Sequence, residues 1–185
     1  MPPVGLFFLV LFIIGGVGYS LTRSEERSAA EQSSAVKKAD HPTADKKIRE
    51  GMQAPDFELY KLDGQQVRLS ALRGRPVLVM FWSTQSPTCT DEMPGLVSFY
   101  ESHQLPGLEV LAVNVTKTES SVEDVKEFAT KYKLPFPVLL DPDMKAQEAY
   151  QAAIIPTSFL LDEKGVIRKI FQEPLTVESL EKAGY

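Results

Sequence analysis

The order of the apolar segments predicts an α/β fold, namely a three-layer sandwich built on a mixed sheet. Between residues 77 and 151, runs of strand length alternate with segments of helical periodicity, which is typical of parallel strands joined through helices. One hairpin signal comes before this region and a second follows it. Antiparallel strands are therefore expected beside the parallel ones, and the sheet should be mixed.

The first half of the predicted domain contains a hairpin, a strand and a helix. Asp63-Gly64 is a turn signal that separates two short apolar-polar segments. The central strand that follows is apolar throughout, which indicates burial on both faces. The next helix begins at Pro87, because proline fits the first turn of a helix. The expected ranges are strands 57–59, 67–69 and 77–82 and helix 87–103.

The second half alternates again and ends in a hairpin and a helix. Ser120 and Glu123 match the capping-box pattern at the start of an amphipathic helix. Lys164-Gly165 is the turn signal of the terminal hairpin, and Thr176 is expected to begin the last helix. The other expected ranges are strands 108–115, 136–140, 158–162 and 166–171 and helix 143–151.

The chain divides into three parts by composition. Residues 4–21 are eighteen positions without a charged side chain, close to the minimum of about 18 for a spanning helix. We therefore predict a transmembrane anchor over residues 1–21. A signal peptide is the alternative, although no basic residue precedes the stretch and no small-residue cleavage site directly follows it. Residues 22–50 are polar and predict a tether, and residues 51–185 should form the folded domain.

The charge of the predicted domain limits its partners. Residues 51–185 carry 19 acidic and 13 basic side chains with no basic stripe, which argues against a nucleic-acid partner. The sequence has no Cys/His cluster and no Gly-rich phosphate loop, so neither a metal nor another cofactor is expected.

The single cysteine, Cys89, lies where the predicted central strand turns into the next helix. A cysteine in place of Ser86 would complete a Cys-x-x-Cys, the redox motif of thioredoxin-like folds, in which a helix N-terminus stabilises the first thiolate. Alternatively, Ser86 is only a helix N-cap, a position that favours serine. A serine nucleophile would need a base, and neither His41 nor His103 is well placed to be one, so a hydrolase is disfavoured.

Seven segments of residues 51–184 carry patterns that are specific in combination. They are 54–59, 69–76, 81–82, 92–94, 110–115, 136–141 and 155–157. On these segments the chain resembles the membrane-anchored thioredoxin-like thiol-disulfide oxidoreductases of the TlpA, ResA and StoA type, within the redoxin (AhpC/TSA) superfamily. The resemblance implies a thioredoxin-like fold, with the thiols or disulfides of extracytoplasmic proteins as partners. It further implies cytochrome c maturation or another envelope thiol process as the setting.

The resemblance also implies a location in the cell membrane, with a single span and the C-terminal domain outside the cytoplasm. The charges near the span give little independent evidence on orientation. Arg23 and Arg27 are matched by Glu25 and Glu26, so the excess of positive charge that marks a cytoplasmic side is missing.

The resemblance assigns roles to the candidate site residues. Ser86 matches the attacking cysteine of the family motif, and Cys89 matches the cysteine that resolves the mixed disulfide. Pro156 matches a proline that is usually cis and lies beside the sulfurs, where the backbone of Ile155 could pair with a substrate strand. Glu92 matches an acidic residue that tunes the thiols.

The sequence leaves two alternatives open, one for Trp82 and one for Cys89. Trp82 is placed among the expected substrate contacts, with a core position as the alternative. Cys89 could be reactive or inert, because a helix N-terminus lowers the pKa of a thiol while burial and Glu92 oppose ionisation. Gln85 stands where the family usually has tryptophan, and Ser86 cannot exchange with disulfides, so the ordinary dithiol cycle is not expected to run.

Two alternative functions follow. Peroxiredoxins are relatives in which a Ser or Thr three residues before the reactive cysteine hydrogen-bonds it, as Ser86 could do for Cys89. They also have a proline at the position of Trp82 and an arginine at that of Pro156, both of which this chain lacks. A single-cysteine peroxidase is therefore one alternative, and a non-catalytic peptide-binding module is the other.

Overall fold

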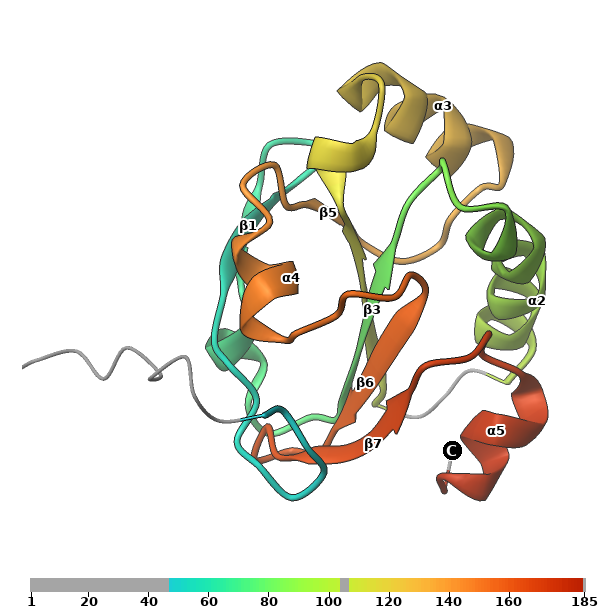
Figure 1. Ribbon diagram of the computed structural model, residues 1–185. Coiled ribbons are helices and arrows are strands. Elements are labelled where there is room, and N and C mark those ends of the chain that lie inside the picture. Colours follow the sequence, from blue (N-terminus) through green and yellow to red (C-terminus); the bar gives the residue numbers. More distant parts are fainter. Residues whose placement is uncertain (1–46, 104–106, 185) are drawn as a thin grey trace, which may run out of the picture. The chain divides into compact units, whose positions relative to one another are not determined.

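A computed structural model describes residues 47–103 and 107–184 of the chain (Figure 1). Within them, seven strands form one sheet in the order β2-β1-β5-β4-β3-β6-β7. The strands are β1 Glu58–Lys61, β2 Gln66–Arg68, β3 Val77–Trp82, β4 Glu109–Asn114, β5 Val138–Leu140, β6 Thr157–Leu161 and β7 Ile167–Phe171. The helices are α2 Pro87–His103, α3 Val122–Lys131, α4 Lys145–Ala149 and α5 Val177–Lys182, with short 3₁₀ helices η1 Leu69–Leu72 and η2 Thr116–Thr118.

The sheet is mixed, as the sequence predicts. β3 pairs in parallel with β4, and β4 pairs in parallel with β5. β6 runs antiparallel to β3, β7 runs antiparallel to β6, and β1 runs antiparallel to both β2 and β5. The parallel strands are those joined through α2 and α3, while the hairpins supply antiparallel strands at both edges. The predicted three-layer α/β sandwich is confirmed.

β3 lies within the sheet, and all six of its residues are buried. Its side chains alternate between the two faces, so one strand contributes to two separate cores. One core holds Val77, Val79 and Phe81, and the other holds Leu78, Met80 and Trp82. Side chains of α4 and η1 join the first core, whereas α2, α3 and α5 supply the second. α4 and α2 accordingly lie on opposite sides of the sheet (Figure 1). Each large apolar side chain buried in this way contributes about 1.5–3 kcal/mol.

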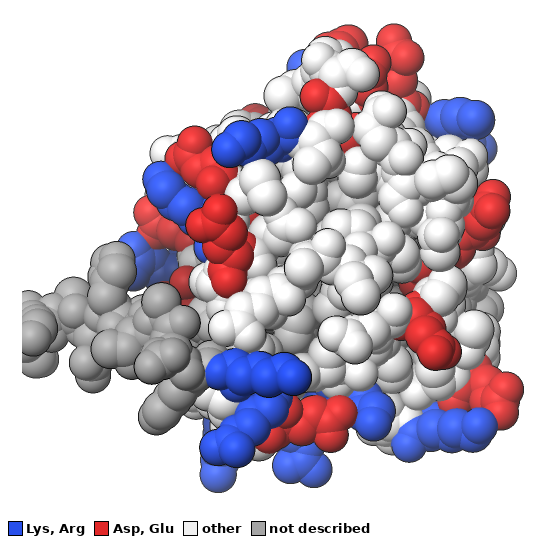
Figure 2. Space-filling view, viewed as in Figure 1, with Lys and Arg blue, Asp and Glu red and all other residues white. Residues whose placement is uncertain are grey.

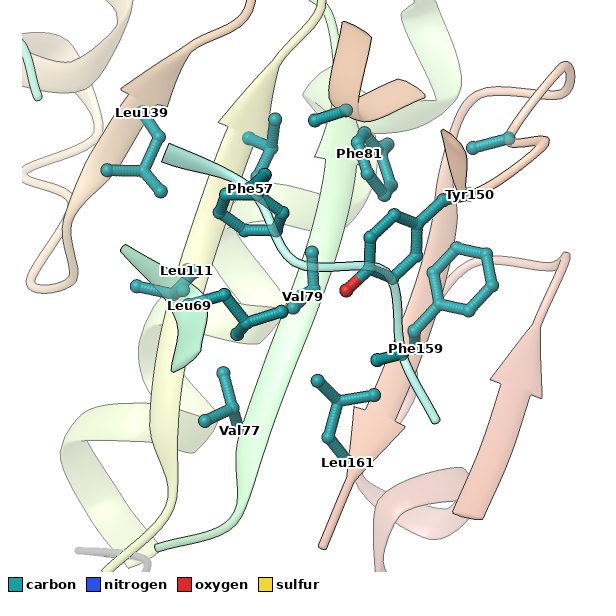
Figure 3. Close-up of a cluster of buried hydrophobic side chains, with 14 of the residues drawn as sticks. Phe57, Leu69, Val77, Val79, Phe81, Leu111, Leu139, Tyr150, Phe159 and Leu161 are labelled. Atoms are coloured by element: carbon teal, nitrogen blue, oxygen red, sulfur yellow. The ribbon is translucent and has the colours of Figure 1, made fainter. Parts of the chain in front are cut away.

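An aromatic cluster occupies the first core (Figure 3). Tyr150, directly after α4, has its ring centroid 5.3 Å from that of Phe81 and 4.9 Å from that of Phe159. Its hydroxyl donates a hydrogen bond of 2.9 Å to the carbonyl oxygen of Pro55, which satisfies the buried O–H group. This contact ties α4 to the segment that enters β1.

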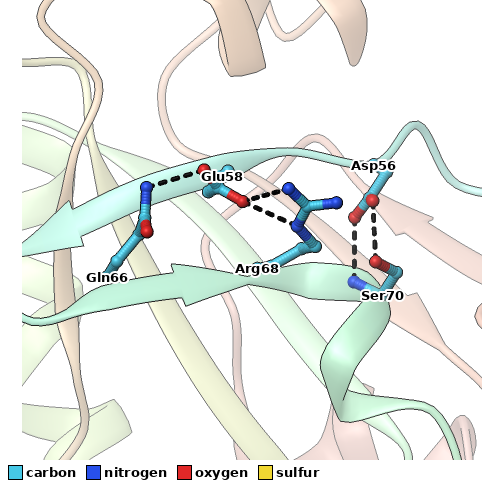
Figure 4. A network of polar contacts seen from close by, with 5 residues as sticks. All are labelled: Asp56, Glu58, Gln66, Arg68 and Ser70. Atoms are coloured by element: carbon cyan, nitrogen blue, oxygen red, sulfur yellow. Dashed lines mark hydrogen bonds and ion pairs between the residues drawn. The ribbon is translucent and has the colours of Figure 1, made fainter.

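Polar side chains hold the N-terminal hairpin on its exposed side (Figure 4). The carboxylate of Glu58 accepts hydrogen bonds of 2.6 Å from both Gln66 and Arg68 across the β1–β2 pair. The carboxylate of Asp56 accepts hydrogen bonds from the backbone N–H and the hydroxyl of Ser70, at 2.8 and 2.7 Å. The Asp56 contacts fix the chain where it leaves β2 and begins η1.

The predicted capping box of α3 is wrong by one residue. The N-cap is Ser121, whose hydroxyl oxygen accepts the backbone N–H of Asp124 at 3.2 Å. Ser121 is the last extended residue before the helix, and only a side chain at that position reaches the free N–H groups of the first turn. Ser120 lies one residue too early.

Several element ends also differ from the prediction. Leu69, expected in the second strand, instead begins η1. The helix expected over 143–151 is shorter, because Met144 and Gln151 adopt left-handed backbone angles (φ of 58° and 53°) that cannot continue a helix. The strand expected from residue 136 begins at Val138.

The predicted anchor over residues 1–21 lies outside the described residues. Among residues 47–103 and 107–184, no helix has the length and apolar character needed to cross a membrane. Of the predicted tether, residues 47–50 are described, and part of this stretch contacts the domain. Ile48 packs against the first core, and Glu50 accepts the backbone N–H of Ile170 on the edge strand β7 at 3.3 Å.

Candidate functional site

The candidate site lies where β3 ends and α2 begins. The chain leaves β3 after Trp82 and passes through a loop formed by residues 83–86, which we call the β3–α2 loop. Pro87 is the first residue of α2, where a missing N–H group costs nothing. The turn before β6 approaches this loop, because β6 pairs directly with β3.

Ser86 joins the start of α2 to the turn before β6. Its hydroxyl oxygen accepts the backbone N–H of Cys89 at 3.4 Å, which is the contact expected of an N-cap. The same hydroxyl donates to the carbonyl oxygen of Ile155, also at 3.4 Å. The Ser86 hydroxyl therefore makes the contact of a helix N-cap at the start of α2.

Cys89 is fully buried, with no exposed surface. Burial raises the pKa of its thiol, while the neighbouring Ser86 side chain and Ser83 backbone lower it. The two charged groups that act on the sulfur, Glu92 and Glu119, both raise the pKa further. The net shift of the pKa is upward, so any stabilisation of the thiolate by the helix N-terminus is outweighed. The thiol stays protonated at neutral pH.

Pro156 is buried, and the peptide bond that joins it to Ile155 is cis. The turn is closed by Thr157, whose hydroxyl donates a hydrogen bond of 2.6 Å to the carbonyl oxygen of Ile154. Ile154 is 60% exposed, a high value for a large apolar side chain. The structure thus brings Pro156 and Ile155 beside Ser86, and it adds Ile154, which the sequence reasoning did not single out.

Trp82 is a core residue in this structure. Its side chain is fully buried, and its ring centroid lies 5.0 Å from that of Phe128 on α3. A side chain in this position does not face a substrate that docks on the surface. The core alternative describes Trp82, and the expected direct substrate contact is corrected accordingly.

Glu92 lies one turn beyond Cys89 on α2 and is only 7% exposed. One carboxyl oxygen, Oε1, accepts the backbone N–H of Leu175 at 2.6 Å, and the other has no hydrogen-bond partner among the described residues. Burial raises the pKa of this carboxyl to about 7, although the bond from Leu175 lowers it. Glu92 also lines a largely apolar groove of about 550 Å³ between α2 and α5.

A carboxylate that the sequence analysis missed holds the β3–α2 loop. Glu119, just after η2, accepts hydrogen bonds of 2.7 Å from the backbone N–H of Thr84 and from the side-chain amide of Asn114. Its second oxygen accepts the hydroxyl of Thr84. No local pattern marks Glu119, because its partner Thr84 lies 35 residues away in the sequence.

The described residues contain no group of three or more His, Cys, Asp or Glu side chains that could hold a metal ion. The site contains one buried thiol, one capping hydroxyl and two nearby carboxyl groups, which belong to Cys89, Ser86, Glu92 and Glu119.

Comparisons with known proteins identify the relatives of the chain. The sequence profile of the AhpC/TSA family matches residues 51–170. The chain is 38% identical over 132 residues to the thiol-disulfide oxidoreductase ResA of Geobacillus kaustophilus, covering 71% of this chain and 74% of the relative. It is 40% identical over 136 residues to the thioredoxin-like protein YneN of Bacillus subtilis, covering 73% and 78%.

Solved structures agree with these matches. The crystal structure of StoA from Bacillus subtilis superposes with a TM-score of 0.64 at 31% identity, covering 71% of this chain and 98% of that one. A putative thiol:disulfide interchange protein DsbE from Chlorobium tepidum superposes with a TM-score of 0.65 at 27% identity, covering 74% and 95%.

Proposed function

From the premise that the chain belongs to the AhpC/TSA family, among relatives that are thiol-disulfide oxidoreductases, we propose that it docks extended polypeptides bearing thiols or disulfides without running the dithiol cycle. One observation carries this proposal. The Ser86 hydroxyl stands at the start of α2, where the resemblance expects the attacking sulfur, and the only thiol is buried one turn behind it.

The chemistry of disulfide exchange supports the loss of the cycle. Exchange begins when an accessible thiolate attacks a disulfide sulfur. A serine hydroxyl has no thiolate to offer, and Cys89 is buried with a raised pKa. In a Cys-x-x-Cys motif, the second cysteine acts only after the first has formed a mixed disulfide with the substrate. Cys89 occupies the second position and therefore has no intermediate to resolve.

The surface around the turn before β6 supports docking. Ile154 presents an apolar side chain to solvent next to the cis-Pro156 peptide. Viewed as in Figure 1, the face that carries α4 and β6 is mostly uncharged, and charged side chains gather around its margins (Figure 2). An extended peptide could pair with the backbone of Ile155 here and place an apolar side chain against Ile154.

The peroxidase alternative has one feature in its favour, which is that the Ser86 side chain lowers the pKa of the Cys89 thiol. The charges around the sulfur oppose it. A peroxidatic thiolate needs positive charge nearby, whereas both charged groups that act on Cys89 are carboxylates.

We predict that Cys89 reacts with hydrogen peroxide no faster than an ordinary free thiol. Burial and two carboxylates keep the sulfur protonated and covered. The measurement is stopped-flow peroxide consumption by the folded protein, with Cys89→Ala as the control, and alkylation by iodoacetamide reports accessibility in parallel. A Cys89-dependent rate several orders of magnitude above that of a free thiol would make the protein a single-cysteine peroxidase.

We further propose that residues 1–21 anchor the protein in the cell membrane with the domain outside the cytoplasm. Envelope thiol chemistry, including cytochrome c maturation, is then the setting. The support is the apolar stretch 4–21 and the family resemblance.

We predict that the full chain sediments with membranes, whereas a chain lacking residues 1–21 does not. Full-length protein with an intact N-terminus in the soluble fraction would contradict the anchor.

A further inference from the structure

The β3–α2 loop is attached to α2 at Cys89, whose side chain is fully buried. The Ser86 hydroxyl accepts the backbone N–H of Cys89 at 3.4 Å, and the backbone N–H of Ser86 donates to the carbonyl oxygen of Ser83 at 3.3 Å. The loop residues between them are Thr84 and Gln85. Thr84 lies between these contacts, so a residue that holds Thr84 also holds the loop in place beside Cys89.

Thr84 is fixed by Glu119 through both its backbone and its side chain. The backbone N–H of Thr84 donates to one carboxylate oxygen at 2.7 Å, and its hydroxyl donates to the other. Asn114, fully buried at the end of β4, donates its side-chain N–H to the same oxygen as the Thr84 backbone, at 2.7 Å. One carboxylate thus links the loop to the sheet through three hydrogen bonds, which are of the charge-assisted kind.

The rest of the loop depends on weaker contacts. The Ser83 hydroxyl accepts the backbone N–H of Gln85 at 3.1 Å and the hydroxyl of Thr118 at 3.3 Å. The Ser86 hydroxyl makes two contacts of 3.4 Å. Hydrogen bonds between neutral groups are roughly half as strong as charge-assisted ones, so the Glu119 carboxylate is the main restraint on the loop.

We propose that Glu119 is a positioning residue. Its hydrogen bonds to Thr84 hold the β3–α2 loop in place, and the loop in this position keeps Cys89 inaccessible to solvent and to docked polypeptides. The inference rests on the proposed function, since it concerns access to the same site. Loss of the Glu119–Thr84 hydrogen bonds would let the loop open locally while the sheet and both cores stay folded. Accessibility of the only thiol is thereby set by a carboxylate on a different connection of the fold.

The test is the alkylation of Cys89 by iodoacetamide in the full chain at several urea concentrations below the unfolding transition. Glu119→Ala should raise the rate roughly tenfold to a hundredfold, because it removes charge-assisted hydrogen bonds to Thr84. Glu119→Gln, which keeps one acceptor oxygen, should fall between Glu119→Ala and the natural chain. Glu123→Ala is the matched control, since it removes the same charge from an exposed side chain paired only with Lys126 among the described residues.

Local opening is distinguished from general destabilisation by the urea dependence. A local opening exposes little surface, so the rate of alkylation through it should hardly change with urea. The rate of alkylation through global unfolding should instead rise steeply with urea. The proposal is overturned if Glu119→Ala leaves the rate unchanged, or if its rate follows the global free energy of unfolding. Rapid alkylation of the natural chain would instead contradict the proposed function, so the two failures can be told apart.

Discussion

Replacing Ser86 by cysteine is expected to create a dithiol that forms an intramolecular disulfide and reduces protein disulfides, which the natural chain does not do. The new thiol would replace a hydroxyl that already contacts the backbone N–H of Cys89 at 3.4 Å. It would stand at the N-terminus of α2, where the helix dipole stabilises a thiolate. We expect disulfide reduction roughly a hundredfold or more above that of the natural chain.

The measurement combines a thiol count under denaturing conditions with the reduction of a protein disulfide in the folded state. Thr88→Cys is the matched control, because it adds a second cysteine at an exposed position of the same helical turn. The oxidised Ser86→Cys protein should show no free thiol after denaturation, whereas Thr88→Cys should keep both. Two free thiols in the oxidised Ser86→Cys protein would show that the inferred geometry of the site is wrong.

The parts of the fold that the sequence predicts are those with strong local signals. The continuous apolar run of β3, the Asp63-Gly64 turn and the proline that starts α2 each determine the backbone within a few residues. The cap of α3 shows the limit of such signals. Ser120 and Ser121 are both good caps by residue type, and the choice between them depends on which residue is last in the extended conformation.

The site is less predictable because its contacts are long-range. Ser86 and Cys89 could be located from the motif, since their spacing lies within one helical turn. The hydrogen bond that Glu92 accepts from Leu175 joins residues 83 positions apart, and the one that Glu119 accepts from Thr84 joins residues 35 positions apart. These partners meet only once the sheet has formed, so no local pattern reveals them.

The burial of Glu92 predicts a pH-dependent stability that a neutral side chain would remove. Its pKa is raised from 4.5 to about 7, mainly by burial, so the folded state binds this proton more tightly than the unfolded chain does. The resulting stabilisation is fully present below about pH 4.5 and is lost as the pH rises through about 7. A shift of this size corresponds to roughly 3 kcal/mol.

Compared with the natural chain, Glu92→Gln is therefore expected to be more stable at pH 8 but not at pH 5. The glutamine oxygen can still accept the N–H of Leu175, while its unpaired amide group costs about 1 kcal/mol. The expected gain at pH 8 is thus about 2 kcal/mol in the free energy of unfolding relative to the natural chain, with no gain at pH 5.

Urea denaturation at both pH values measures this difference. Asp91→Asn is the matched control, since it removes one charge from the neighbouring residue, which is exposed and lines the same groove. We expect the control to change stability by less than about 0.5 kcal/mol at either pH, as is usual for exposed positions. If Glu92→Gln changed stability equally at pH 5 and pH 8, the carboxyl would not titrate between them, and the solvent-excluded environment assigned to Glu92 would be wrong.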